Sequence, residues 1–150
     1  MDDREERTWR ALQHMQMRID AELARRLASD ASLSCPEYHV LEALTDNPEG
    51  RLRMFELGEA LGWEKSRTSH QVGRMVERGL VKKTQCPSDR RGSHIAVTAK
   101  GRRAIEAAVP EYEAAVSKLF SDHLTPRQLD ALRRAAETVL AGLDEEPHEE

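Results

Sequence analysis

The sequence predicts a mainly α-helical fold of the α+β class. Most of the chain carries apolar residues at every third or fourth position, which is the period of an amphipathic helix. Only two short runs have the character of β-strands, and turn-forming Pro, Gly, Asn and Asp separate the segments. A chain of 150 residues is long enough for one domain with an appended helical platform.

Two helices are expected first. Residues 4–29 carry a single apolar stripe on a charged background, so we expect a long helix that needs a partner surface. The stretch Ser34-Cys-Pro-Glu37 has the form of a capping box, in which the Ser side chain caps the helix and the Glu side chain reaches back. The short helix that it opens is expected to end at the Asn-Pro-Glu-Gly turn of residues 47–50.

A helix-turn-helix is predicted next. Residues 54–61 suit a short helix, Gly62 interrupts it, and residues 64–78 suit a second helix that stops at Gly79. Three residues of the second helix are expected to face the core: Val72, Met75 and Val76. Its opposite face is polar, and all the formal charges on that face are positive.

A β-hairpin and two more helices are expected after it. Residues 80–85 and 93–98 are predicted strands joined by a basic loop that contains Pro, Ser, Asp and Gly. Thr98 is placed to cap a helix over residues 99–121, in which Pro110 favours a kink. Thr125-Pro-Arg-Gln128 is a second capping box, and the helix that it opens is expected to end near Gly142.

The charge is distributed unevenly along the chain. Residues 51–103 hold 13 Lys and Arg against 5 Asp and Glu, a net charge of +8. The other residues hold 10 against 22, a net charge of −12, which leaves −4 for the whole chain. A basic central segment between acidic flanks suits a protein that holds a polyanion at one face, and nucleic acid is the obvious polyanion.

Several classes of protein are not expected. No apolar run approaches the roughly 20 residues that span a bilayer, and no secretory signal is present, so we expect a soluble cytoplasmic protein without a membrane partner. Cys35 and Cys86 are too far apart for a paired zinc site and too few for a disulfide scaffold. The six His residues are not spaced like metal ligands, so no metal site is expected. No nucleophile or phosphate-loop motif occurs, so we expect neither enzymatic activity nor a cofactor.

A helix-turn-helix followed by a hairpin suggests a DNA-binding protein. A helix fits the major groove of B-DNA, and an Arg at a hairpin tip can enter the minor groove, whose negative potential attracts it. The candidates for base contacts are Arg67, Ser69, His70 and Gln71. The candidates for phosphate contacts are Arg51, Arg53, Lys65, Arg74, Lys82, Lys83 and Arg90. Two simpler roles stay open, since Asp89 can cap its turn and Arg74 can pair with Glu77.

The hairpin also resembles a known signature. Asp89-Arg90-Arg91, five residues and then Val97-Thr98 is similar to the D-x-R-x5-(L/V)-T pattern of the MarR family of bacterial winged-helix transcription regulators. The stretches LSCPEYHVLEAL and LGWEKSRTSHQVGRMVERGLV resemble that family's second helix and its recognition helix, and the resemblance covers roughly residues 8–143.

This resemblance implies a role for particular residues. It places Arg91 at the minor groove, makes Asp89 the acid that orients it, and assigns the recognition-helix contacts to Ser66, Arg67, Ser69, His70 and Arg74. The chain departs from the family at Arg53, where a capping Thr or Ser is common, and at His70, where an Arg is common. The operator sequence therefore cannot be transferred from the family.

The terminal helices are expected to form a homodimer. Their wide apolar stripes lie outside a small winged-helix core, and a twofold copy is the simplest partner that buries them. Such a dimer presents two recognition helices one turn of DNA apart, which predicts a palindromic double-stranded operator. The expected organisation is an N-terminal dimerisation helix (1–34), a winged helix-turn-helix lobe (35–100), C-terminal dimerisation helices (101–143) and an acidic disordered tail (144–150). A monomer capped by its own helices is the alternative.

The trigger that releases DNA is open between two mechanisms. The resemblance implies a small-molecule effector in a pocket beside the dimer helices, and an aromatic carboxylate suits the candidates there: Trp9, Arg10, His14, Tyr38 and His39. Alternatively, Cys35 in the first turn of a helix, where the dipole lowers a thiol pKa, or Cys86 beside the wing senses oxidants. A winged-helix adaptor that binds protein instead of DNA is a third reading, and it would lack a steep dependence of binding on salt.

Overall fold

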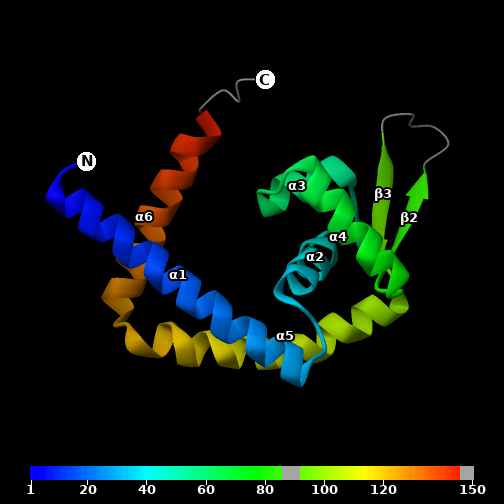
Figure 1. Ribbon diagram of the computed structural model, residues 1–150, viewed down its shortest axis with the longest axis horizontal. Coiled ribbons are helices and arrows are strands. Elements are labelled where there is room, and N and C mark those ends of the chain that lie inside the picture. Colours follow the sequence, from blue (N-terminus) through cyan, green and yellow to red (C-terminus); the bar gives the residue numbers. More distant parts are fainter. Residues whose placement is uncertain (86–91, 146–150) are drawn as a thin grey trace. The chain divides into compact units, whose positions relative to one another are not determined.

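The computed structural model describes residues 1–85 and 92–145. The chain divides into two compact units, residues 1–113 and 114–150. The first unit holds helix α1 (Asp3–Asp30), helix α2 (Cys35–Asp46), strand β1 (Arg51–Arg53), helix α3 (Met54–Leu61), helix α4 (Lys65–Glu77), strands β2 (Val81–Gln85) and β3 (Ser93–Val97), and most of helix α5 (Ala99–Leu119) (Figure 1). The predicted mainly helical α+β class is confirmed.

The first two helices begin with capping boxes. In α1 the Asp2 side chain accepts from the Glu5 N–H and the Glu5 carboxylate accepts from the Asp2 N–H. In α2 the predicted box is confirmed, because Ser34 Oγ lies 3.2 Å from the Glu37 nitrogen and Glu37 Oε1 lies 2.9 Å from the Ser34 nitrogen. Only Leu23 and Leu27 of α1 are buried, so the N-terminal two thirds of that helix lie outside the core.

Helices α3 and α4 form the predicted helix-turn-helix. Gly62 adopts the left-handed conformation (φ 66°, ψ 32°) that ends α3, and the Trp63 N–H donates to the Gly58 carbonyl at 2.9 Å. Gly58 permits a close approach to α4, since a Cβ atom there would lie 3.1 Å from Thr68 Oγ1. The side of α4 that faces the core carries Thr68, Val72 and Met75. Val76 was predicted to share that side and is instead 40% exposed, because Thr68 occupies the inner face.

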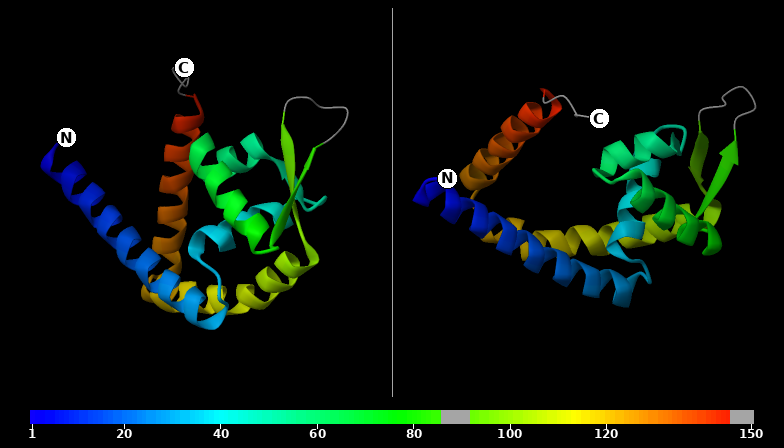
Figure 2. Two further views of the ribbon diagram at one scale, coloured as in Figure 1. Left: turned by 45° about the vertical axis from the view of Figure 1, so that its right-hand side comes forward. Right: turned by 45° about the horizontal axis from the view of Figure 1, so that its top comes forward.

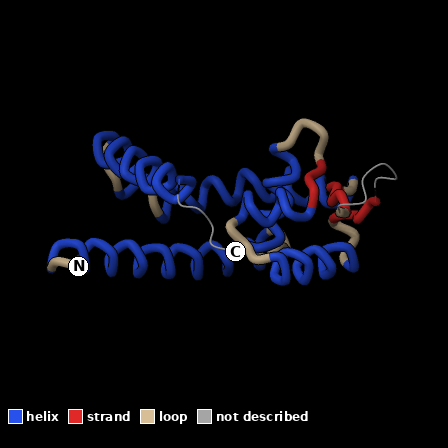
Figure 3. Tube along the Cα trace, turned by 90° about the horizontal axis from the view of Figure 1, so that it is seen from above, coloured by secondary structure: helices blue, strands red, loops and turns tan. Residues whose placement is uncertain are grey.

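The predicted pairing of residues 80–85 with residues 93–98 is confirmed in strands β2 and β3, and a third strand, β1, extends the sheet. The strand order is β1-β3-β2, with Leu52 opposite Ile95 on one side of β3 and Lys83 opposite Ile95 on the other. Strand β1 was missed because three residues are too short for a period-two pattern. β2 and β3 run side by side in both views of Figure 2, and all three strands group beside the helices in Figure 3.

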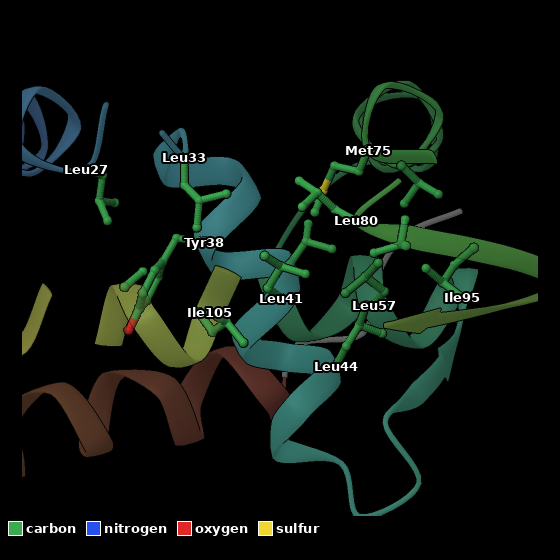
Figure 4. Close-up of a cluster of buried hydrophobic side chains, with 14 residues drawn as sticks. Leu27, Leu33, Tyr38, Leu41, Leu44, Leu57, Met75, Leu80, Ile95 and Ile105 are labelled. Atoms are coloured by element: carbon green, nitrogen blue, oxygen red, sulfur yellow. The ribbon is translucent and has the colours of Figure 1, made fainter. Parts of the chain in front are cut away.

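The core of this unit is a single apolar cluster. Figure 4 shows Leu41 and Leu44 of α2, Leu57 of α3 and Met75 of α4 in one cluster, with Ile95 of β3 at the sheet side. These five side chains are all fully buried, at 0% exposure. Burying such side chains contributes about 1.5–3 kcal/mol each, so this cluster fixes α3 and α4 against α2 and the sheet.

The second unit holds the end of α5, a 3-10 turn (Ser121–His123) and helix α6 (Pro126–Glu145). The predicted capping box is confirmed at 2.9 Å from the Thr125 nitrogen to Gln128 Oε1 and 3.2 Å from the Gln128 nitrogen to Thr125 Oγ1. Helix α6 extends beyond Gly142, so Asp144 and Glu145, expected in a disordered tail, are helical. The remaining tail residues lie outside the described ranges. Across residues 1–85 and 92–145, no helix has both the length and the apolar character needed to span a membrane.

Candidate nucleic-acid interface

Helix α4 presents an exposed face made almost entirely of predicted contact residues. Six of them are exposed on this helix: Lys65, Ser66, Arg67, Ser69, His70 and Arg74. Gln71 is half-buried at the edge of the face. The structure therefore brings together the candidates that the sequence placed on the second helix.

The charge of this face is uniformly positive between Lys65 and Arg74. The first turn of α4 contains no acidic residue, and Arg74 lies in its last turn. Within the described part of the chain Arg74 makes no salt bridge to Glu77, so the simpler role for Arg74 as a helix-surface ion pair finds no support. A row of cations without paired acids attracts an anionic partner.

The C-terminal end of α4 is fastened by a Schellman motif. The Leu80 N–H donates to the Met75 carbonyl at 3.0 Å and the Gly79 N–H to the Val76 carbonyl at 3.0 Å, with Gly79 at φ 73°. Thr98 then joins this end to α5, because its hydroxyl donates to the Gly79 carbonyl at 2.6 Å and accepts from the Gly101 N–H at 3.0 Å. The predicted capping role of Thr98 is confirmed.

Sequence reasoning missed an ion pair that links α2 to the end of α4. Arg78 donates to Glu37 Oε2 and, through its second terminal nitrogen, to the Ser32 carbonyl at 3.1 Å. The Glu37 side chain is only 8% exposed and uses its other oxygen for the capping box of α2. One carboxylate thus links the start of α2 to the end of α4. No sequence signal points to this pair, since its members are 41 residues apart.

A second missed residue is Trp63. The guanidinium carbon of Arg67 lies 4.5 Å from the centroid of the Trp63 ring, which is cation–π geometry. The i, i+4 spacing of the two residues is a sequence signal that could have indicated this contact.

The sheet contributes further cations. Lys82 and Lys83 are exposed on β2, and Arg51 on β1 is exposed and paired with Glu49 at 3.1 Å. Arg53 ends β1 opposite His94, and its N–H donates to Glu56 Oε1 at 3.0 Å, so backbone and Glu side chain cap α3 in place of a Thr or Ser hydroxyl. The predicted wing-tip residues lie outside the described ranges: Cys86, Asp89, Arg90 and Arg91.

The expected effector residues fall into two groups. Tyr38 is buried and stacks on Tyr112 with 4.0 Å between ring centroids, and His39 meets Tyr38 edge-on at 5.9 Å. Burial and neighbouring carboxylates raise the pKa of both Tyr hydroxyls. The other group, Trp9, Arg10 and His14, is exposed on the N-terminal half of α1. Trp9 precedes the buried Leu23 by 14 residues, or about 21 Å of helix.

The expected effect of the helix dipole on Cys35 is wrong in sign. Burial raises the pKa of the Cys35 thiol, and the charge of Asp20 raises it further. A raised pKa leaves less of this thiol as thiolate than in an ordinary cysteine.

A helix-turn-helix followed by an antiparallel hairpin defines a winged-helix protein. The MarR family profile matches residues 29–92. The transcriptional regulator HosA of Escherichia coli O111:H- is 33% identical over 78 residues, which are 52% of this chain and 56% of that regulator, so the match spans about half of its length.

Two solved structures cover nearly the whole chain. Sco3205, a MarR family transcriptional regulator from Streptomyces coelicolor solved in complex with DNA, is 32% identical with a TM-score of 0.90, covering 99% of this chain and 95% of that one. AbsC, another MarR family transcriptional regulator from Streptomyces coelicolor, is 30% identical with a TM-score of 0.90, covering 97% and 98%. The chain belongs to the MarR family.

Proposed function

We propose that this chain is a homodimeric transcriptional regulator that binds double-stranded DNA sequence-specifically. The observation that carries the proposal is the exposed face of α4, on which every charged residue from Lys65 to Arg74 is a cation. A helix of this kind fits the major groove, and its cations meet phosphates. The similar regulator Sco3205 was solved in complex with DNA, which supports the same activity here.

Each part of the surface has its own role in this proposal. Base edges are read by exposed polar side chains of α4: Ser66, Arg67, Ser69, His70 and, at the edge of the face, Gln71. Phosphates are met by cations of α4, the sheet and the wing: Arg53, Lys65, Arg74, Lys82 and Arg90. Arg91, oriented by Asp89, enters the minor groove, as the family signature implies.

The homodimer accounts for apolar surface that the chain leaves uncovered. In α6 no residue is buried, and Val139, Leu140 and Leu143 are 62%, 58% and 55% exposed. In α1 Trp9 and Met17 are 55% and 64% exposed. A twofold partner that covers these helices sets two recognition helices about 34 Å apart, which fits a palindromic operator. Leu140→Asp should therefore raise the dissociation constant of the dimer, as measured by sedimentation equilibrium.

The effector in this proposal is a small aromatic acid, and the protein is a repressor that the acid releases. The stacked Tyr38 and Tyr112 rings with the edge-on His39 offer aromatic surface and one imidazole that can meet a carboxylate. The raised thiol pKa of Cys35 favours this effector over an oxidant, since oxidation begins at the thiolate.

A salt titration tests DNA binding directly. The wild-type protein should bind a duplex from the region upstream of its own gene with a steep negative slope of log K against log salt concentration, because each neutralised phosphate releases counterions. Arg74→Ala should reduce that slope by about 1 per protomer if it neutralises one phosphate. A flat slope with the wild-type protein would contradict DNA binding and favour a protein-binding adaptor.

A further inference from the structure

The ring of Trp63 is held in place by the turn between α3 and α4. The backbone N–H of Trp63 donates to the Gly58 carbonyl at 2.9 Å, and the half-buried Trp63 side chain packs against the core cluster. A Cβ atom on Gly58 would lie 3.2 Å from the Trp63 carbonyl, so α3 packs closely against this turn. The ring therefore has a defined position relative to the first turn of α4.

The Arg67 side chain lies over that ring. Arg67 is four residues after Trp63 and exposed, and its guanidinium carbon is 4.5 Å from the ring centroid, inside the roughly 6 Å range of a cation–π contact. Across residues 1–85 and 92–145 no carboxylate forms a salt bridge with Arg67. The indole face is thus the partner that holds this cation in the unbound protein.

The chemistry of a guanidinium suits this arrangement. Its N–H groups lie in the plane of the group, so contact through one face leaves the edge able to donate two parallel hydrogen bonds to guanine O6 and N7 or to a phosphate. Arg74, also exposed on α4, has no aromatic ring beneath it in the described ranges. Of these two arginines, only Arg67 has its guanidinium against an aromatic ring in residues 1–85 and 92–145.

We infer that Trp63 is a positioning residue for DNA recognition, which orders the Arg67 guanidinium at the start of the recognition helix without contacting DNA itself. The inference rests on the proposed DNA-binding function and adds to it. An exposed Arg loses rotamer freedom when it binds, and a side chain that is already ordered loses less. Trp63 therefore strengthens binding and discrimination at the base pair that Arg67 meets in each half-site.

A double-mutant cycle tests the coupling. The four proteins are the wild type, Trp63→Leu, Arg67→Met and the double variant, each titrated by fluorescence anisotropy against a duplex that the wild-type protein selects from a random-sequence library. Trp63→Leu should weaken binding about 2- to 5-fold for each half-site, the equivalent of an exposed cation–π contact. In the Arg67→Met background the same change should have little further effect, because the side chain through which Trp63 acts is gone.

Two controls separate positioning from packing. In an Arg74→Met background Trp63→Leu should keep its full effect, since Arg74 does not lie on the ring. Trp63→Phe keeps an aromatic face and should bind with an affinity between those of the wild type and Trp63→Leu. Equal losses from Trp63→Leu in the Arg67→Met and Arg74→Met backgrounds would show that the ring acts through packing alone and would overturn the inference.

A measurement without DNA keeps this inference apart from the proposed function. In the free protein the Arg67 Nε–H resonance should be shifted upfield by the indole ring current, and Trp63→Leu should abolish that shift. An unshifted resonance in a protein that binds duplex would overturn the positioning inference alone. Failure of the wild-type protein to bind any duplex would instead overturn the proposed function, and with it a role for Trp63 in recognition.

Discussion

Among the glycines described in the structure, Gly101 is the one at which substitution by Ala should lower the free energy of unfolding the most. It lies in the first turn of α5, directly against the backbone that follows α4. A Cβ atom there would lie 2.0 Å from the Leu80 carbonyl oxygen and 3.1 Å from Val97 Cγ2. Because the nearest atom belongs to the backbone, relief requires α5 and the start of β2 to separate by about 1 Å or more.

The cost of Gly101→Ala follows from what that separation disturbs. The Leu80 carbonyl accepts from the Thr98 N–H at 3.2 Å and from the Thr98 hydroxyl at 3.1 Å. Overpacking costs about 1–3 kcal/mol and each weakened hydrogen bond about 0.5–1.5 kcal/mol. The higher helix propensity of Ala offsets at most about 1 kcal/mol of this destabilisation. We expect a net loss of about 2–4 kcal/mol in the free energy of unfolding.

Urea denaturation followed by far-UV circular dichroism measures this loss, with all proteins at one concentration because the stability of the proposed dimer would depend on concentration. Gly73→Ala is the matched control, since a Cβ atom on this α4 residue meets nothing within 4 Å. It should raise the free energy of unfolding by about 0.5–1 kcal/mol. A Gly101→Ala protein as stable as the wild type would refute the close packing of α5 on Leu80.

Three further predictions concern the charges of the protein. Glu37→Gln keeps an oxygen that can accept from the Ser34 N–H, but it removes the negative charge that faces Arg78, whose side chain is 45% exposed. Urea denaturation should therefore show that the free energy of unfolding falls by about 1–3 kcal/mol. Folding raises the pKa of Tyr38, so above the ordinary Tyr pKa the folded protein keeps a proton that the unfolded chain loses. The free energy of unfolding should therefore keep the full contribution of Tyr38 below the ordinary Tyr pKa and should fall as pH rises above it. In denaturation curves measured at a series of pH values, Tyr38→Phe should reduce this fall in the free energy of unfolding at alkaline pH. The same fall in the variant as in the wild type would show that Tyr38 is not its cause. Arg91→Ala should weaken binding to the selected duplex by about 1–3 kcal/mol with the dimer intact, whereas wild-type affinity in a gel-shift assay would rule out the wing contact.

Local features of the fold were predictable because their partners are close in sequence. The boxes at Ser34 and Thr125 join atoms three residues apart, and Gly62 and Gly79 mark helix ends where a left-handed residue is needed. The exposed face of α4 was predictable for the same reason, since helical period alone separates Arg67 and His70 from the buried side.

Features that depend on distant partners were not predictable. Strand β1 exists because Leu52 pairs with Ile95, which lies 43 residues further along the chain. Val76 was predicted to be buried and is exposed, whereas Thr68 is buried because α3 packs closely on α4 at Gly58. The pKa of Cys35 rises because neighbouring elements bury the thiol, and helix position alone predicted the opposite sign.

The amino-acid sequence alone determined the order of the α-helices and of strands β2 and β3, the capping boxes at Ser34 and Thr125, and the cationic face of α4, because periodicity and short-range hydrogen bonds act within a few residues. Only the tertiary structure decided that Glu37 holds Arg78, that Gly101 lies against Leu80 and that the Tyr38 and Tyr112 rings stack. Each of these contacts joins groups more than 20 residues apart, and it forms only when the apolar core brings their elements together.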